Sequence, residues 1–213
     1  MKFIVIMISF LISTFTSVCA YSADGNAALY DVTAPADSAF IRVFNSSDAS
    51  VNVKLSAKTE VQPVSTYQLG DYLFASAGQY QLTVGAVTSS ISLDKNEVIT
   101  FVYDGATLTP INDDFYDGLK KAQISFYNLT SQTLSLKTVN GKHAVVKDVQ
   151  PGKAGSRKVN EVKMAFAVFN EKVKAAEFES KFLKKGRSYS YVVVNKSGLF
   201  DTILVANKVS SVE

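Results

Sequence analysis

Residues 39–54 of the chain read AFIRVFNSSDASVNVK, and residues 122–137 read AQISFYNLTSQTLSLK, 83 positions further on and without a gap. The two stretches share Ala, Ile, Asn and Lys at matching positions, and several other positions keep the same kind of residue. A second similarity joins residues 93–103 (LDKNEVITFVY) to residues 183–193 (LKKGRSYSYVV). Internal repetition on this scale indicates a structural unit that recurs along the chain. We therefore expect two similar small domains.

Short alternating runs within each repeat predict the class of these domains. Residues 51–55 (VNVKL) place apolar side chains at a period of two, as expected of a strand with one face in a core. Turn residues recur about every 8–12 positions, a spacing typical of an immunoglobulin-like β-sandwich. We therefore predict an all-β chain with two tandem small immunoglobulin-like β-sandwich domains, residues 29–112 and 118–213, joined by a linker at 113–117.

Three segments carry more specific predictions. Residues 91–103 are expected to form a hairpin around the turn at 94–96. Residues 104–118 contain Gly, Pro and four Asp, and are expected to hold the domain junction. Residues 171–183 are rich in Glu, Lys and Ala, which favours a helix, but their place in the repeat is that of a strand. Their apolar residues alternate only around a bulge near Ala176, so we predict a bulged strand.

The first 20 residues have the pattern of a cleaved signal peptide. Lys2 precedes an apolar run, and residues 18–20 (VCA) place small residues for cleavage after position 20. Residues 21–28 are expected to be a flexible lead-in. Cleavage would remove Cys19, the single Cys of the chain, so the mature protein would have neither a disulfide nor a thiol nucleophile. Secretion without disulfides favours a bacterial periplasm.

The charges of the two repeats are opposite. Residues 21–117 contain 4 Lys and Arg against 12 Asp and Glu, a net charge of −8. Residues 118–213 contain 17 Lys and Arg against 7 Asp and Glu, a net charge of +10. Such an asymmetry indicates charged protein partners or a polyanion.

The residue inventory favours a protein without a catalytic site, a metal or a cofactor. His143 is the single histidine and follows an Asn-Gly turn, so we interpret it as a solvated loop residue rather than a general base. Asp113, Asp114 and Asp117 could hold Ca²⁺, but they lack the loop glycine and terminal Glu of a calcium loop, so we interpret them as a solvated acidic linker. Asn45 and Asn128 match the glycosylation sequon, although their equivalent places in the repeat favour an Asn-initiated turn.

The basic second domain provides the candidate binding residues. We expect two Gly-containing loops to share one end of the sandwich and form a patch for carboxylates, in which arginine offers a bidentate fork. The alternative is a set of solubilising lysines on strand edges. Arg42, a lone cation in the acidic domain, is either an outward contact residue or a partner of Asp31, Asp37 or Asp48. The candidate residues are Arg42, Lys153, Arg157, Lys158, Lys184, Lys185 and Arg187.

Two sets of residues match the pattern of a known family. The first is residues 29–45 (LYDVTAPADSAFIRVFN). The second consists of residues 126–128 (FYN), 134–138 (LSLKT), 140–142 (NGK), 157–160 (RKVN) and 167–169 (AVF). On these residues the chain resembles the alginate biosynthesis protein AlgF family. The resemblance implies a periplasmic accessory protein of polysaccharide O-acetylation, which works beside a membrane acyl carrier and periplasmic acetyltransferases.

These observations predict a non-catalytic periplasmic adaptor that is required for O-acetylation of alginate or a similar exopolysaccharide. Its partners would be periplasmic or membrane-anchored polysaccharide acetyltransferase proteins. The alternative is a module that binds an anionic exopolysaccharide through the basic second domain, with a strong dependence on salt. Nucleic acid is not expected as a partner, because no recognition module of that kind is present.

Overall fold

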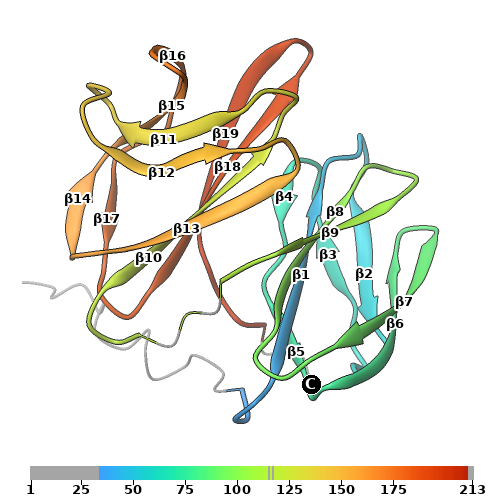
Figure 1. Ribbon diagram of the computed structural model, residues 1–213. Coiled ribbons are helices and arrows are strands. Elements are labelled where there is room, and N and C mark those ends of the chain that lie inside the picture. The colour runs from blue at the N-terminus through green and yellow to red at the C-terminus, as the bar shows by residue number, and fades with distance from the viewer. Residues whose placement is uncertain (1–33, 115, 117, 211–213) are drawn as a thin grey trace, which may run out of the picture. The chain divides into compact units, whose positions relative to one another are not determined.

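The computed structural model describes residues 34–114, 116 and 118–210, which form nineteen β-strands and no helix (Figure 1). The prediction of an all-β chain is confirmed. No helix in this part of the chain has the length and apolar character needed to cross a bilayer. The predicted signal peptide (1–20) and lead-in (21–28) lie outside the described residues.

The strands up to residue 112 make up what we call the N-terminal half. They are β1 (Ala39–Asn45), β2 (Val51–Leu55), β3 (Gln62–Val64), β4 (Gln68–Leu69), β5 (Leu73–Ala75), β6 (Gly78–Val84), β7 (Val87–Leu93), β8 (Val98–Tyr103) and β9 (Leu108–Asn112). One sheet has the order β4-β1-β8-β9, with β5 also paired to β1, and the other has the order β3-β2-β6-β7. Both sheets contribute to one hydrophobic core, for example Ile41 and Val43 from the first and Leu55 and Leu82 from the second.

The strands from residue 122 onward make up the C-terminal half. They are β10 (Ala122–Leu129), β11 (Leu134–Thr138), β12 (Ala144–Val149), β13 (Lys153–Val159), β14 (Val162–Met164), β15 (Phe166–Asn170), β16 (Val173–Glu177), β17 (Lys181–Leu183), β18 (Ser188–Lys196) and β19 (Leu199–Ala206). The two main sheets have the orders β13-β10-β18-β19 and β12-β11-β15-β16, and β14 pairs with β17. They share a second core, which includes Ile124, Phe126, Leu136 and Val168.

The two halves repeat the same strand order. The sheet β4-β1-β8-β9 corresponds to β13-β10-β18-β19, and β3-β2-β6-β7 corresponds to β12-β11-β15-β16. Each half also contains one parallel pair, β1 with β8 and β10 with β18 (Figure 1). Arg42 lies opposite Thr100 in the first pair, and Ser125 lies opposite Ser190 in the second. The sequence repeat therefore extends to topology and register.

The repeated asparagine at the end of the first strand anchors a turn in each half. Asn45 is fully buried, and its Nδ2 donates to the carbonyls of Ala49 (2.8 Å) and Val64 (3.1 Å). Its Oδ1 accepts from the amide and the hydroxyl of Ser47. Asn128, which is also fully buried, makes the equivalent bonds to Gln132, Val149 and Thr130. The interpretation as Asn-initiated turns is confirmed, and both amides are hidden from a glycosylating enzyme.

One local prediction is wrong because consecutive strands belong to different sheets. The turn at 94–96 is not a hairpin, since β7 pairs with β6 while β8 pairs with β1 and β9. Both strands face the same core, which produces the alternation that resembles a hairpin. The segment 104–118 contains β9, which ends at Asn112, so only the residues after 112 separate the last strand of the N-terminal half from the first strand of the C-terminal half. Pro110 is tolerated there because β9 is an edge strand.

The segment 171–183 is strand, as predicted, and its bulge is confirmed. The register between β15 and β16 shifts where Val168 and Phe169 pair with Ala176 and Lys174. The prediction of a single strand is wrong, because β16 and β17 join different sheets. Phe178 lies between them, 2% exposed, and packs edge-on to a buried tyrosine, Tyr191, with ring centroids 4.9 Å apart. Burying this ring in the core interrupts the strand.

Candidate functional site

A charged side chain is buried where the two halves meet. Arg42 of β1 is 1% exposed, and its Nε donates to the hydroxyl of Thr100 on β8 (3.0 Å). Its Nη2 donates to the hydroxyls of Tyr127 and Ser190, both at 2.7 Å, and its Nη1 donates to Oδ1 of Asn207 (2.9 Å). These last three partners belong to the C-terminal part of the chain. One guanidinium therefore joins the two halves through directional bonds.

Two aromatic rings and a carboxylate complete the surroundings of Arg42. The guanidinium carbon lies 4.2 Å from the centroid of the Tyr72 ring and 5.3 Å from that of Tyr127, which is cation–π geometry. Oδ2 of Asp113 accepts from the hydroxyls of Thr100 (2.7 Å) and Tyr72 (3.0 Å). We call the connected set the junction cluster, and its members are Arg42, Tyr72, Thr100, Asp113, Tyr127, Ser190 and Asn207.

The electrostatics of the junction cluster favour a permanent positive charge. Burial alone would lower the pKa of the Arg42 guanidinium, but Tyr127, Tyr72 and Asp113 hold that pKa above its ordinary value. Burial raises the pKa of Asp113 above its ordinary 3.8, and the attraction of Arg42 offsets only part of the rise. Burial also raises the pKa of the two phenols, which stay neutral. Among the described residues, no group donates a hydrogen bond to the buried Oδ1 of Asp113.

Apolar packing and main-chain bonds extend the contact between the halves. The outer faces of the sheets that contain β1 and β10 share an apolar cluster. Its buried members are Phe44, Ile111, Tyr127, Val192 and Val194. The amide of Tyr72 donates to the carbonyl of Lys208 (2.9 Å), and the amide of Ser210 donates to the carbonyl of Tyr72 (2.8 Å). The segment after β19 is thereby bound to the N-terminal half.

The interpretation of Arg42 as an outward contact residue is wrong, because its side chain is buried. Of the three carboxylates expected as alternatives, Asp37 and Asp48 are not among its hydrogen-bond partners, and Asp31 lies outside the described residues. The interpretation of Asp113 as a solvated linker residue is also wrong, because it accepts two hydrogen bonds in the junction cluster. Asp114 is exposed, as expected, whereas Asp117 lies outside the described residues.

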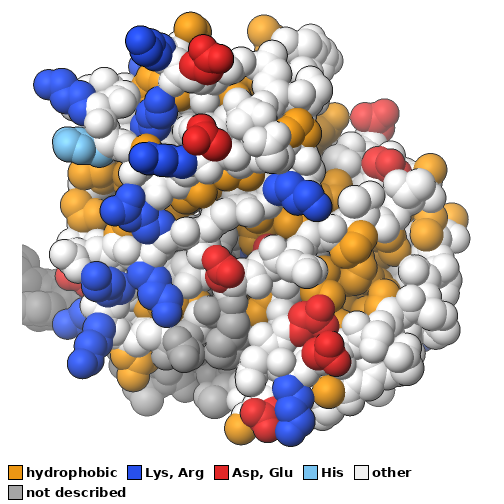
Figure 2. All heavy atoms as spheres, viewed as in Figure 1, with side chains coloured by type: hydrophobic (Ala, Val, Ile, Leu, Met, Phe, Trp, Pro, Cys, Tyr) orange, Lys and Arg blue, Asp and Glu red, His pale blue; other side chains and the backbone are white. Residues whose placement is uncertain are grey.

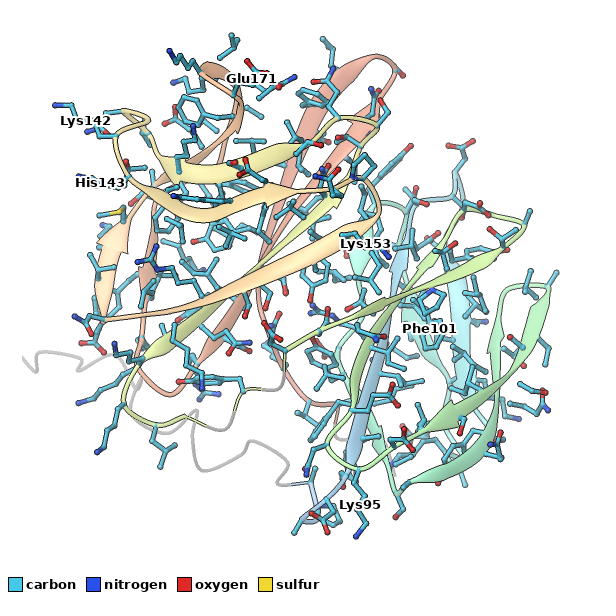
Figure 3. All side chains as sticks on the ribbon, viewed as in Figure 1. Lys95, Phe101, Lys142, His143, Lys153 and Glu171 are labelled. Carbon is cyan, nitrogen blue, oxygen red and sulfur yellow. The ribbon has the colours of Figure 1, made fainter. Side chains whose placement is uncertain are left out.

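The six basic candidates of the second domain lie in two places. Lys153, Arg157 and Lys158 are on strand β13, not in a loop as predicted. The predicted loop at 184–187 is present as the turn between β17 and β18, where Gly186 adopts a φ of +75°. Figure 3 shows Lys153 at the far end of β13 from Lys142 and His143. The single patch that was predicted is therefore divided.

Part of that patch does share one end of the sheet. Lys158 lies opposite Gln123, and Gln123 lies opposite Ser188, the residue after the turn. The amide of Gly186 donates to the carbonyl of Lys121 (2.8 Å), which brings the turn beside a further lysine. Arg187, however, lines a separate cavity of about 450 Å³ next to the junction cluster.

A groove of about 690 Å³ gathers the basic side chains that the sequence did not connect. We call it the basic groove. Its exposed charged and imidazole side chains come from β12, β13 and the segments before β10 and β12: Lys121, Lys142, His143, Lys147, Arg157 and Lys158. Its apolar side chains are Val145, Val159, Val162, Met164 and Phe166. Figure 2 shows Lys and Arg side chains gathered over the C-terminal half, around the one histidine.

The sequence analysis missed Lys121, Lys142 and Lys147, because they come from segments separated from β13 by turns. The strong Asn140-Gly141 turn was the available signal, since it returns the chain to pair with β11 and so places Lys142 just before β12 and Lys147 on it. His143 is exposed on this turn, and its amide donates to the hydroxyl of Thr138 (3.2 Å). Among the described residues, no three His, Cys, Asp or Glu side chains are grouped so that they could hold a metal ion.

The chain is similar in sequence both to AlgF proteins and to a family model. A family model described as "Alginate O-acetyl transferase AlgF" matches residues 13–190. The alginate biosynthesis protein AlgF of Azotobacter vinelandii is 30% identical over 184 residues, which cover 86% of this chain and 84% of that protein. The AlgF of Pseudomonas aeruginosa is 29% identical over 196 residues, 91% of this chain and 90% of that protein. A solved C-terminal domain of AlgF from P. aeruginosa covers 41% of this chain and 99% of its own, with 33% identity and a TM-score of 0.39.

Proposed function

The chain is a member of the AlgF family, whose role lies in alginate O-acetylation, and on this premise we propose that it is a non-catalytic periplasmic adaptor. Its two halves would be domains, residues 29–112 and 118–213 with a linker at 113–117. The acidic half would bind one polysaccharide acetyltransferase protein, and the basic half would bind another. Like-charge repulsion would keep each partner from the other's surface.

The observation that carries the proposal is the junction cluster. Two halves of opposite charge are connected by a buried arginine and by a shared apolar cluster. An inflexible connection would fix the distance between two bound partners, which is what an adaptor requires.

The location of the perturbed titratable groups supports a non-catalytic role. Strongly shifted pKa values in an open cleft are a common mark of an active site. Here the pKa shifts of Arg42 and Tyr127 arise in the junction cluster, where both side chains are 1% exposed. Those side chains are placed to bind each other rather than a substrate. We expect the purified protein to release no acetate from model esters, and the His143→Ala variant to support normal acetylation in cells.

The adaptor proposal is tested by capturing acetylation proteins on the full-length chain. Charge removal in the acidic half, Asp48→Asn with Glu60→Gln and Asp71→Asn, should weaken capture of one partner. Charge reversal in the basic groove, Lys142→Glu with Lys147→Glu, should weaken capture of the other. All five side chains are exposed, so folding should be retained, as circular dichroism can verify. Loss of the same single partner in both variants would contradict the proposal.

A second candidate function is binding of a uronate polymer in the basic groove. The six basic-type side chains around one groove favour it, because polymer carboxylates recur at regular spacing. Electrostatic binding of this kind should weaken steeply as salt rises. Titration of defined oligouronates into the full-length protein at two salt concentrations tests it. Absence of binding at low salt would exclude this function.

A further inference from the structure

We propose that the basic groove recognises an extended acidic segment of a partner protein, one whose Asp or Glu residues flank apolar side chains. This inference rests on the adaptor function proposed above and names the surface that the basic half would use. Three properties of the groove indicate what binds there: its charge, its apolar centre and whether its strand edges are free to pair with another strand.

The charge of the groove calls for an anionic occupant. Its lining contains Lys or Arg at five positions and one histidine, while none of the described lining residues is Asp or Glu. Lys121, Lys142, Lys147, Arg157 and Lys158 are all exposed. A concave surface lined by one sign of charge concentrates the potential and attracts the opposite charge.

The centre of the groove calls for apolar side chains on that occupant. Val145, Val159, Val162 and Met164 are half-buried and pack against the core of the C-terminal half. An apolar centre inside a charged rim is the usual anatomy of a protein–protein interface. Met164 adds a flexible, polarisable surface that adapts to irregular partner side chains. The polyanionic sugar is less well matched, because this floor is aliphatic and its one aromatic ring, Phe166, is 2% exposed.

The strand edges indicate how the segment would be held. β12 and β13 are edge strands of two different sheets, and the groove lies along both. Nη1 of Arg157 donates to the carbonyl of Ala144 (2.8 Å), which ties β13 to the start of β12. That bond occupies an edge carbonyl that an added strand would need. We therefore expect recognition through side chains rather than by extension of a sheet.

The test uses the full-length protein and overlapping peptides that span the periplasmic acetylation proteins of the same bacterium. The peptides that bind should carry net negative charge and at least one large apolar side chain. Lys142→Glu with Lys147→Glu should weaken their binding about tenfold or more, because charge reversal replaces attraction with repulsion.

The matched control is Lys163→Glu with Lys172→Glu, which makes the same change in charge away from the groove. Lys163 lies between Val162 and Met164 on β14, so its side chain lies on the face of the strand opposite to these two groove residues. The control should bind within about twofold of the unaltered protein, because exposed distant charges are screened. Equal loss in both pairs of substitutions would overturn the proposal in favour of a general charge effect.

A photo-cross-linking residue at position 147 gives a second readout. In cells it should cross-link to an acidic segment of an acetylation protein, and the same residue at position 163 should not. Cross-links to polysaccharide would overturn the proposal. If the full-length protein captures acetylation proteins but both groove readouts are negative, this inference alone fails. If it captures none, the adaptor function fails with it.

Discussion

The N-terminal and C-terminal halves share one strand order, one parallel pair and one buried asparagine turn, yet they differ at the first strand. Position 42 is arginine in the first repeat, whereas the equivalent position 125 is serine in the second. The guanidinium bonds Thr100 of its own half and Ser190, the equivalent residue of the other half. A single large cation therefore serves two matching hydroxyl positions, which explains why only one copy carries it.

The comparison also distinguishes features that are the same in both halves from features that differ. The turn asparagines, Asn45 and Asn128, are 0% exposed and make the same bonds in both halves. The charged residues carry the difference, with a net charge of −8 over residues 21–117 and of +10 over residues 118–213. Packing constrains the first set of positions, whereas binding of different partners can account for the second.

The largest expected effect comes from removing the asymmetric arginine. Arg42→Leu should lower the free energy of unfolding by about 3–5 kcal/mol, because it leaves Asp113 and several hydroxyls without a charged partner. Ser125→Ala, at the equivalent buried position, should cost far less, about 1 kcal/mol, because it removes a single neutral hydroxyl. Urea unfolding of both variants measures the contrast. Equal costs would show that the junction cluster does not contribute to stability.

Substitution of the turn asparagine should lower stability by a similar amount in each half. Asn45→Ala and Asn128→Ala each leave buried amides and carbonyls unpaired, so each should cost about 2–3 kcal/mol. The two values should agree because the bonds are the same in both halves. Thermal or urea unfolding provides the measurement, and a large cost in only one half would contradict the equivalence.

A smaller effect is expected from making the second half resemble the first. Tyr127→Phe installs the residue found at the equivalent Phe44 and removes one hydroxyl that accepts from Arg42. The loss should be about 1.5–2 kcal/mol, as for a hydrogen bond to a charged group. Combining it with Arg42→Leu should add less than its separate cost, because both substitutions remove the same bond.

The smallest effect concerns pH and Asp113. Its pKa is raised in the folded protein, so the folded state holds the proton more tightly than the unfolded state does. The stability that this adds is complete below the unfolded pKa and is lost as pH rises through the folded pKa. The free energy of unfolding of the Asp113→Asn variant, relative to that of the unaltered protein, should therefore be higher at neutral pH than at acidic pH. Denaturant unfolding at several pH values tests the direction, and the opposite trend would mean that Arg42 outweighs burial.

The repeat predicted the fold more completely than the site. The matching sequences around Asn45 and Asn128 indicated the duplicated turns, because most of the bonds that each asparagine makes link residues two to four positions apart. The alternation around Ala176 was enough to locate a bulge. Strands β7 and β8 were assigned to one hairpin because period-two alternation does not reveal which sheet a strand joins.

Arg42 was misread for a different reason. Its partners Tyr127, Ser190 and Asn207 lie 85 to 165 positions away along the chain, so no local pattern connects them. Alternation along β1 indicated that Arg42 faces away from the core of its own half. It could not show that a second sheet covers that face. The basic groove escaped detection similarly, since its lysines converge only after β12 and β13 have folded.

In the proposed adaptor, two oppositely charged halves hold different acetylation proteins at the same time. The most direct measurement is reconstitution of a three-component complex from this chain and two acetylation proteins, followed by analytical ultracentrifugation. The two acetylation proteins should co-sediment when the full-length chain is present. Lys142→Glu with Lys147→Glu should release one of them and leave the other bound. Mutually exclusive binding of the two partners to the unaltered chain would show that it does not hold both at once.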